Sequence, residues 1–307
     1  MRIVNIGSLN IDYVYDVRNF VQKGQTISSE GRSTFAGGKG LNQSIALGRA
    51  GVEVCHAGLV GPEGAPLRDL LSASGVNVDW VRQTDECATG HAIIQRDREG
   101  DNCIILYGGA NQRVDETFVD EVLASFSAGD WVLLQNETGS LAYAIRSAKD
   151  RGMWVALNPS PVNGALLNCP LELVDCFILN EGEAAQLTGL DASASSPAEL
   201  LAAMGERFPR ADTVLTIGSE GSMCLSSGET FRQPARKVEA VDTTAAGDTF
   251  TGYYLAERSR GTSAPDALRI ASTASALAVS RKGAAPSIPA RAEVEELLAS
   301  DEQVPAN

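Results

Sequence analysis

Short runs of apolar residues, each long enough for one β-strand, recur along most of the chain. From residue 2 to residue 241 they read RIVNIG, VEVCHAGLVG, DWVLLQNE, MWVALNPS, VDCFILN, DTVLTIG and KVEAV. Most of these runs are apolar throughout rather than alternating with polar residues, which is typical of strands buried on both faces. The pattern therefore predicts a mainly parallel β-sheet.

The segments between these runs have the spacing of helices. In GLNQSIALGRAG, the residues Leu41, Ile45 and Leu47 lie near one helix face. SLAYAIRSAKDRG ends at Gly152, a residue type that favours a helix C-terminus. Alternating strands and helices predict an α/β fold, doubly wound, whose sheet is covered by helices on both faces.

Two segments depart from this alternation. Residues 12–35 are polar, interrupted by glycine and without helical period, and residues 89–109 (TGHAIIQRDREGDNCIILYGG) read as two strands around the turn REGD. We expect both segments to form a small second β-sheet that acts as a lid. The expected lid comprises residues 12–36 and 89–109, and the expected core comprises residues 1–11, 37–88 and 110–307.

Composition and charge narrow the possible partners. The chain of 307 residues is 44% hydrophobic and 21% charged, as globular proteins are, and its net charge of −14 makes nucleic acid and anionic membranes poor partners. The six cysteines form no C-x-x-C pair, and with only two histidines they argue against a zinc site. The N-terminal apolar run is too short for a signal peptide, and no run could span a bilayer. We expect a soluble, reduced, cytoplasmic protein.

Candidate ligand-binding residues follow the predicted strands, because doubly wound folds bind ligands beyond the carboxyl ends of their strands. Asn10 and Asp12 follow RIVNIG and point the same way if the chain stays extended, which suits two adjacent hydroxyl groups. An Asx turn is the alternative. In FAGGKGLNQS, a glycine cluster lets a ligand approach the backbone, with Lys39 and Asn42 at the mouth of a helix. A flexible turn and helix cap is the alternative, and Gly40 after Lys39 excludes a Walker A motif.

Acidic residues mark two further strand ends. LLQNE leaves Glu137 at one end, and LNEGE leaves Asn180 and Glu183 three residues apart at a helix start. Such a pair can hold a hydrated Mg²⁺ through its waters, with Glu183 as the acid. The alternative is a capping box with Asn180 as N-cap, and the two interpretations are compatible.

The stretch VDTTAAGDTF follows the predicted strand KVEAV and precedes a good helical sequence. A helix that begins here has free N–H groups from about Ala245 to Asp248, and these favour an anion. Alanine and glycine let that anion come close, so the site suits the charge that develops during phosphoryl transfer. Asp248 lies beside it, where it can take a proton from an attacking hydroxyl. A Thr/Asp helix cap is the alternative, but it leaves the second aspartate unexplained.

The same residues carry a resemblance to a known family. Motifs matching in order are GSLNID, GGKGLNQS, GDNCIILYGGAN, LLQNE, ALNPSP, LNEGEAAQLTG, TIGSEG, VDTTAAGDTFTG and AVSRKGAAPSIP, from Gly7 to about Pro289. The chain thus resembles the ribokinase family of carbohydrate kinases, the PfkB group. The pair GGKG…N and DTxAAGD is the most specific part of the match. The resemblance implies a three-layer α/β domain with a small β-sheet lid.

The resemblance also implies a role for each matching residue. Sugar hydroxyls would be held by Asn10, Asp12, Gly38, Lys39, Asn42, Glu137 and Asp248. ATP would be contacted by Asn180, Thr216, Gly218, Ser219, Gly221, Gly247 and Ser272. Ala246 and Gly247 would form the anion hole, and Asp248 would be the catalytic base. Potassium, the monovalent cation, would be ringed mostly by backbone oxygens of Asp242, Thr244, Ala278, Arg281, Gly283 and Ser287.

The chain departs from the family pattern at a few positions. Gly182 stands in NEGE where the family often has Thr, and Ser272 stands where it often has His or Asn near the adenine. Tyr107 replaces a more usual His in the lid, and TFAGGKG differs just before the glycines. The last two departures would lie near the covered sugar and so bear on the choice of substrate.

The resemblance implies an ATP-dependent sugar kinase that uses Mg²⁺ and K⁺, with D-ribose giving D-ribose 5-phosphate as the best substrate. It also implies a homodimer formed through the lid. Alternatives of the same class are kinases of another pentose, a ketohexose or a nucleoside. The alternative of a different class is a non-catalytic sugar or nucleotide sensor on the same fold.

Overall fold

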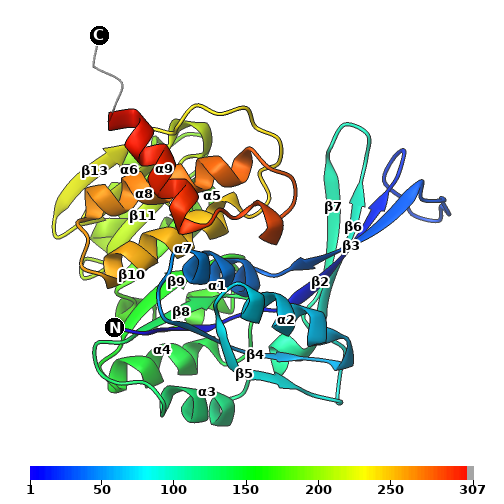
Figure 1. The fold of residues 1–307 in the computed structure, drawn as a ribbon, viewed down its shortest axis with the longest axis horizontal. Coiled ribbons are helices and arrows are strands. Elements are labelled where there is room, and N and C mark those ends of the chain that lie inside the picture. The colour runs from blue at the N-terminus through cyan, green and yellow to red at the C-terminus, as the bar shows by residue number, and fades with distance from the viewer. Residues whose placement is uncertain (303–307) are drawn as a thin grey trace.

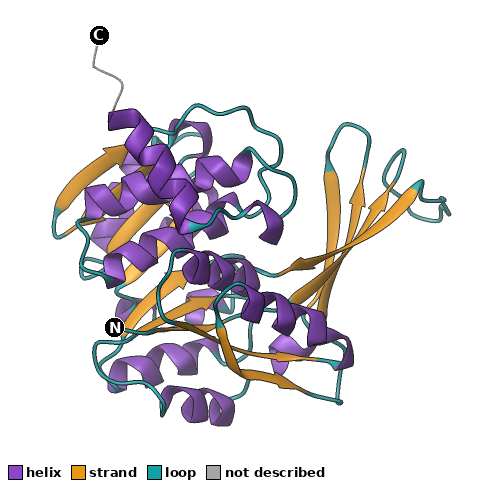
Figure 2. Cartoon of the chain, viewed as in Figure 1, coloured by secondary structure: helices purple, strands orange, loops and turns teal. Residues whose placement is uncertain are grey.

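The computed structural model describes residues 1–302, which form two β-sheets and the helices that pack on them (Figure 1, Figure 2). The larger sheet has nine strands in the order β13-β12-β11-β10-β9-β8-β1-β4-β5. Neighbouring strands from β5 to β11 pair in parallel, whereas β12 pairs antiparallel with both β11 and β13. The strands are β1 (Ile3–Ile6), β4 (Val54–Val60), β5 (Asn77–Gln83), β8 (Trp131–Gln135), β9 (Trp154–Asn158), β10 (Cys176–Asn180), β11 (Asp212–Thr216), β12 (Ser222–Ser226) and β13 (Glu229–Gln233).

Helices cover both faces of this sheet, as the apolar strands require (Figure 2). Successive residues of β1 point to opposite faces: Ile3 packs in one hydrophobic cluster and Val4 in another. The fold is therefore a three-layer, doubly wound α/β fold, which confirms the predicted class. The helices are α1 (Lys39–Arg49), α2 (Ala65–Ala73), α3 (Glu116–Leu123), α4 (Leu141–Asp150), α5 (Glu181–Thr188), α6 (Pro197–Arg207), α7 (Ala246–Ser259), α8 (Ala264–Val279) and α9 (Arg291–Glu302). Within residues 1–302, every helix is too short or too polar to cross a membrane.

The second sheet projects away from the α/β layers (Figure 1). Its order is β3-β2-β6-β7, with β2 (Asn10–Asp16), β3 (Gly31–Gly37), β6 (Gly90–Arg96) and β7 (Asn102–Tyr107). The turn REGD joins β6 to β7, as predicted. Strand β2 follows β1 closely along the chain, so the polar residues after β1 lie where the two sheets meet.

One predicted strand is wrong. Residues 234–240, which include most of KVEAV, have no regular secondary structure. Val238 is 39% exposed and Val241 is 49% exposed, so these valines are not buried between neighbouring strands. The sheet ends instead at β13. Three strands, β5, β12 and β13, were not predicted. Both β5 and β13 are partly exposed, with polar residues that break any apolar run, and β12 is largely buried but has only three apolar residues between two serines.

Close contact between α1 and α7 sets the geometry of the region above the sheet. A Cβ atom on Gly252 of α7 would lie 2.4 Å from the Cβ of Ala46 and 3.0 Å from the carbonyl oxygen of Gln43. Any other residue at position 252 would push the helices apart. The backbones can approach only because of this glycine, and the first turns of α1 and α7 contribute facing residues to one region.

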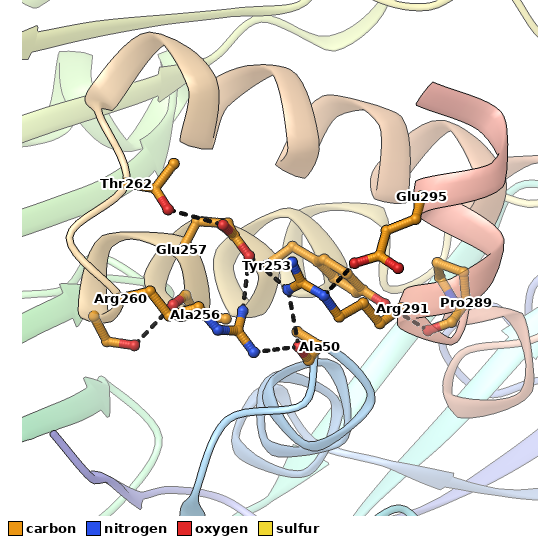
Figure 3. A network of polar contacts seen from close by, with 10 residues as sticks. Ala50, Tyr253, Ala256, Glu257, Arg260, Thr262, Pro289, Arg291 and Glu295 are labelled. Carbon is orange, nitrogen blue, oxygen red and sulfur yellow. Dashed lines mark hydrogen bonds and ion pairs between the residues drawn. The ribbon is translucent and has the colours of Figure 1, made fainter. Parts of the chain in front are cut away.

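A buried ion cluster fastens the far ends of these helices (Figure 3). The carboxylate of Glu257 accepts hydrogen bonds from Arg260 at 2.7 Å, Arg291 at 2.7 Å and Thr262 at 2.9 Å. Both arginines also donate to the carbonyl oxygen of Ala50 at the end of α1. The cluster thus joins α1, α7 and α9.

Replacing Glu257 by Gln should lower the free energy of unfolding by about 1–3 kcal/mol at pH 7, because two guanidinium groups lose their shared acceptor charge. Burial alone would raise the pKa of Glu257, but the Arg291 and Thr262 hydrogen bonds and the arginine charges outweigh it and lower that pKa. Because the folded pKa lies below the unfolded value, this stabilisation is present above the unfolded pKa and lost as pH falls through the folded one.

Urea denaturation at pH 7 and at low pH measures this effect. Glu295, which is 59% exposed and also bonds Arg291, offers a matched control. Glu295→Gln should change stability by less than about 1 kcal/mol. Equal losses in the two variants at pH 7 would contradict the account.

Candidate active site

Residues from the carboxyl ends of the parallel strands and from the starts of α1 and α7 surround two adjoining cavities. The large cavity, of about 700 Å³, and the small cavity, of about 230 Å³, share lining residues that include Asn180, Thr216 and Gly247. The large cavity brings together every residue assigned to ATP by resemblance: Asn180, Thr216, Gly218, Ser219, Gly221, Gly247 and Ser272. These residues come from β10, β11, the loop after it, α7 and α8.

The start of α7 opens onto both cavities. Ala245 has a left-handed backbone, with φ of 61°, and the N–H of Ala246 closes a turn onto the carbonyl oxygen of Thr243 at 3.2 Å. Within residues 1–302, the N–H groups of Gly247 and Asp248 have no hydrogen-bond partner. A Cβ atom on Gly247 would meet nothing within 4 Å, so no protein group requires glycine here. The open space and free N–H groups suit an anion. The role of Ala246 in an anion hole stays a prediction.

The carboxylate of Asp248 is held from α1. Asn42 donates through Nδ2 to Oδ2 at 3.0 Å, and Gln43 donates through Nε2 to Oδ1 at 2.9 Å. The Oδ1 atom of Asn42 is buried and has no partner among the described residues. Gln43 was not singled out from the sequence, although it directly follows Asn42. Its position next to Asn42, in the first turn of the same helix, was the feature of the sequence that could have indicated its role.

Lys39, the first residue of α1, supplies a positive charge to the small cavity. Burial works against this charge, but the carboxylates of Asp248, Glu137 and Glu183 outweigh it, and the pKa of Lys39 is raised. Among the described residues no carboxylate lies within 4 Å of its ammonium group, so Lys39 stays available to an anionic ligand.

Asn10, Asp12 and Glu137 gather where the two sheets meet. Asn10 accepts a hydrogen bond from Asn111 at 2.8 Å, and Glu137 accepts hydrogen bonds from the hydroxyl of Ser8 and, at 3.2 Å, from the backbone of Lys39. Burial, and then the charge of Glu137, raise the pKa of Asp12 to about 6. Burial likewise raises the pKa of Glu137. Two carboxylates that resist ionisation so close together indicate a site made for a polar ligand.

Tyr107, which departs from the family pattern, does not share a sheet face with Asp12. Strand pairing places Asp12 opposite Phe35 and Ala92, and Ala92 opposite Leu106, whereas Tyr107 lies opposite His91. Because neighbouring residues along a strand point to opposite faces, Leu106 shares the face of Asp12 and Tyr107 takes the other.

Asn180 and Glu183 form the capping box that the sequence offered as one interpretation. The Asn180 side chain accepts from the Glu183 N–H at 2.9 Å, and the Glu183 carboxylate accepts from the Asn180 N–H at 3.0 Å. Glu183 also lines the small cavity. Within residues 1–302 no group of three or more His, Cys, Asp or Glu side chains could hold a metal by itself.

The residues assigned to a monovalent cation lie on two segments that meet. The Asp242 carboxylate accepts from the Thr244 N–H at 2.9 Å, the Thr244 hydroxyl at 2.6 Å and the Gly283 N–H at 2.9 Å. Ala278 is buried near the end of α8, and Ser287 is buried with its hydroxyl bonded to Ala284. The Arg281 side chain points elsewhere, to Glu293 at 2.5 Å, which leaves only its backbone for a cation.

Replacing Asp12 by Asn should raise the free energy of unfolding by about 1–3 kcal/mol at pH 7.5 and by little at pH 4. The folded pKa of Asp12, about 6, lies above its unfolded value, so protonated Asp12 favours folding at low pH and this advantage is lost as pH rises through 6. Denaturant unfolding of both proteins at the two pH values measures the difference. An equal change in the free energy of unfolding at pH 4 and pH 7.5 would mean that ionisation of Asp12 does not destabilise the folded protein.

Comparison with known proteins agrees with this geometry. Residues 1–291 match the model of the pfkB family carbohydrate kinases. A ribokinase from Schizosaccharomyces pombe is 36% identical over 96% of this chain and 97% of its own.

Solved structures give the same result. A ribokinase from Cryptococcus neoformans in complex with ADP superposes with a TM-score of 0.86 at 32% identity, covering 96% of this chain and 98% of that one. An Arabidopsis thaliana ribokinase complexed with ribose and ATP superposes with a TM-score of 0.84 at 30% identity, covering 97% and 98% of the two chains. The fold therefore has close counterparts among ribokinases over nearly the whole chain, and the chain belongs to the pfkB family of carbohydrate kinases.

Proposed function

We propose that this protein transfers the γ-phosphoryl group of ATP to the 5-hydroxyl of D-ribose, giving D-ribose 5-phosphate and ADP. The observation that carries the proposal is the position of Asp248. Its carboxylate lies beside the free N–H groups at the start of α7, where the large and small cavities meet. A base and an anion site at one helix terminus are what phosphoryl transfer to a hydroxyl requires. The ribokinases that match along nearly the whole chain support ribose as the acceptor.

ATP would occupy the large cavity with its phosphates directed to the start of α7. The free N–H groups of Gly247 and Asp248 would face the transferring phosphoryl group, and the unpaired ammonium group of Lys39 would meet its oxygens from the small cavity. This gives Lys39 a role toward phosphate in addition to the sugar. Glu183 fits a magnesium ion held through water, because it lines the small cavity and keeps one carboxylate oxygen unused by the capping box. Magnesium would neutralise charge on the phosphate oxygens.

Ribose would bind where the two sheets meet. Asp12 and Asn10 would take adjacent hydroxyls, and the unpartnered Oδ1 of Asn42 would accept a hydrogen bond from a sugar hydroxyl. The 5-hydroxyl would give its proton to Asp248 as its oxygen bonds to the γ-phosphorus. The bond from that phosphorus to the β,γ-bridging oxygen breaks, and ADP leaves with the electron pair.

The small sheet, comprising the expected lid segments 12–36 and 89–109, would cover the sugar and exclude water from the reaction.

The edge strand β7 of the small sheet is exposed along its whole length, with Ile104 at 54%, Ile105 at 61% and Leu106 at 50%. An exposed apolar edge strand invites pairing, which supports a homodimer formed through the lid. Light scattering of the purified protein tests this, and a monomer at micromolar concentration would oppose it. The free cysteines of residues 1–302 support a reducing compartment such as the cytoplasm.

Asp248→Asn should lower kcat by a factor of about 10² to 10⁴, because the 5-hydroxyl loses its proton acceptor. The fold and the binding of ribose should stay nearly intact. A coupled ADP-release assay over a panel of sugars and nucleosides, with thermal unfolding as the folding control, measures both effects. A variant with near wild-type kcat would remove Asp248 from the role of base, and failure of the wild type to turn over ATP with any sugar would favour a sensor.

D-ribose should be a better substrate than 2-deoxyribose, because a buried carboxylate that loses its hydroxyl partner is costly. Asp12→Ala should narrow the ratio of kcat/KM between the two sugars, since the penalty disappears with the carboxylate. The same assay gives both ratios. A wild-type enzyme that prefers 2-deoxyribose, a ketohexose or a nucleoside would overturn ribose as the substrate while leaving a kinase.

Potassium should raise kcat/KM above its value in tetramethylammonium buffer. The cation would be held beside Asp242, whose carboxylate already ties the turn before α7 to Gly283, and it would order that turn. Fits of initial rates against potassium concentration at constant ionic strength measure the effect. Equal kcat/KM in the two salts would argue against the cation site.

A further inference from the structure

Behind Asp248, a chain of buried polar side chains runs from α1 through β8 and β1 to β4. Gln43 donates to Asp248 at 2.9 Å and accepts from Gln135 at 2.7 Å. Gln135 also donates to Asn5 at 3.0 Å. Asn5 donates to Ser44 at 2.9 Å, and Ser44 bonds the Nδ1 atom of His56 at 2.8 Å. Gln43, Gln135, Asn5, Ser44 and His56 are all fully buried.

The direction of every hydrogen bond in this series of side chains follows from His56, at the end farthest from Asp248. The Nε2 atom of His56 lies 3.2 Å from the carbonyl oxygen of Gly7, which can only accept, so Nε2 carries the proton. Burial lowers the pKa of His56 to about 4, so the ring is neutral and its Nδ1 accepts from the Ser44 hydroxyl. The oxygen of Ser44 then accepts from Asn5, whose amide nitrogen also faces the carbonyl oxygen of Gly40 at 2.9 Å.

The same logic continues to Asp248. With its nitrogen turned to Ser44, Asn5 presents its oxygen to Gln135, which must donate. The nitrogen of Gln135 also faces the oxygen of Gln43, and the nitrogen of Gln43 is thereby turned to Asp248. An ionised carboxylate can only accept, so the two ends of the chain require the same orientation of every amide between them.

We propose that Gln43 is a positioning residue for the reaction: locked as a hydrogen-bond donor by this series of buried side chains, it fixes the orientation of the Asp248 carboxylate. The inference rests on the proposed role of Asp248 as the base. Asn42, the other donor to Asp248, differs because its own oxygen has no partner in the described part of the chain, so the carboxylate alone orients its amide. Gln43 holds Oδ1, and the free lone pairs of the carboxylate remain for the incoming hydroxyl.

Gln43→Met tests the proposal, because it keeps the length of the side chain and removes only the amide. We expect kcat to fall roughly ten- to a hundredfold with little change in the KM for ribose, since misplacement of a reacting group costs on this scale. The other charged groups near Asp248, namely Lys39 and Glu137, are unchanged by this variant.

A double-mutant cycle separates positioning from a general loss of structure. In the Asp248→Asn background, Gln43→Met should lower kcat by less than twofold, because it acts through the carboxylate that is already gone. If the two losses multiply, or if Gln43→Met alone keeps the wild-type kcat, the proposal is overturned. If instead Asp248→Asn alone keeps the wild-type kcat, the proposed base has failed, and the two failures are thus distinguishable.

Two further variants complete the experiment. Thr213→Val removes another buried hydroxyl, which lies outside this hydrogen-bonded series and has no partner within residues 1–302, and it should leave kcat unchanged. If thermal unfolding shows that Gln43→Met does not fold, Ser44→Ala, which cuts the chain between Asn5 and His56, carries the same test. Its kcat should fall by a smaller factor than that of Gln43→Met, with little change in the KM for ribose, and a wild-type kcat in folded Ser44→Ala overturns the proposal.

Discussion

The structure depends on one steric constraint, the close approach of α1 and α7 at Gly252. Without a side chain at this position, the backbones of the two helices meet, and residues of their first turns come together over the sheet. Lys39, Asn42 and Gln43 come from one helix start, and Gly247 and Asp248 from the other. At the opposite ends, the Glu257 cluster ties α7 to α1 and α9 (Figure 3). A phosphoryl-transfer site placed between two helix termini inherits its geometry from this contact.

The charged residues of the site lie close together because of the contact between α1 and α7. Asp12, Glu137 and Asp248 lie near one another in a partly dry region, and burial raises the pKa of both Asp12 and Glu137. Lys39 lies among them; burial opposes its charge, but the charges of Asp248, Glu137 and Glu183 outweigh burial and raise the pKa of Lys39. Such a cluster is unfavourable for the empty protein, because carboxylates prefer water or a cation. A ligand that brings hydroxyl donors to the carboxylates and phosphate to the lysine relieves both costs. Under the proposed function, relief of this electrostatic cost would favour the binding of both ribose and ATP.

Much of this arrangement could be predicted from the sequence, because doubly wound sheets place strand ends at one edge. Asn180 and Thr216 end neighbouring strands, and the apolar runs before them predict both strands. The segment KVEAV was wrongly predicted to be a strand because it is short and mostly apolar, yet its valines are exposed and the sheet ends at β13. Gln43 escaped notice because its role depends on Gln135 and Asn5, from distant strands, and no local spacing reveals such a contact. The face of the small sheet that Tyr107 occupies likewise depends on strand register, which only the structure supplies.

The central claim is that the protein transfers the γ-phosphoryl group of ATP to the 5-oxygen of ribose, and ³¹P NMR of the reaction mixture tests it most directly. With the purified protein, ATP, magnesium, potassium and D-ribose, the account predicts resonances of ADP together with one phosphomonoester whose phosphorus couples to the two methylene protons at carbon 5. A phosphomonoester that couples to the single anomeric proton, or inorganic phosphate as the only new product, would contradict it.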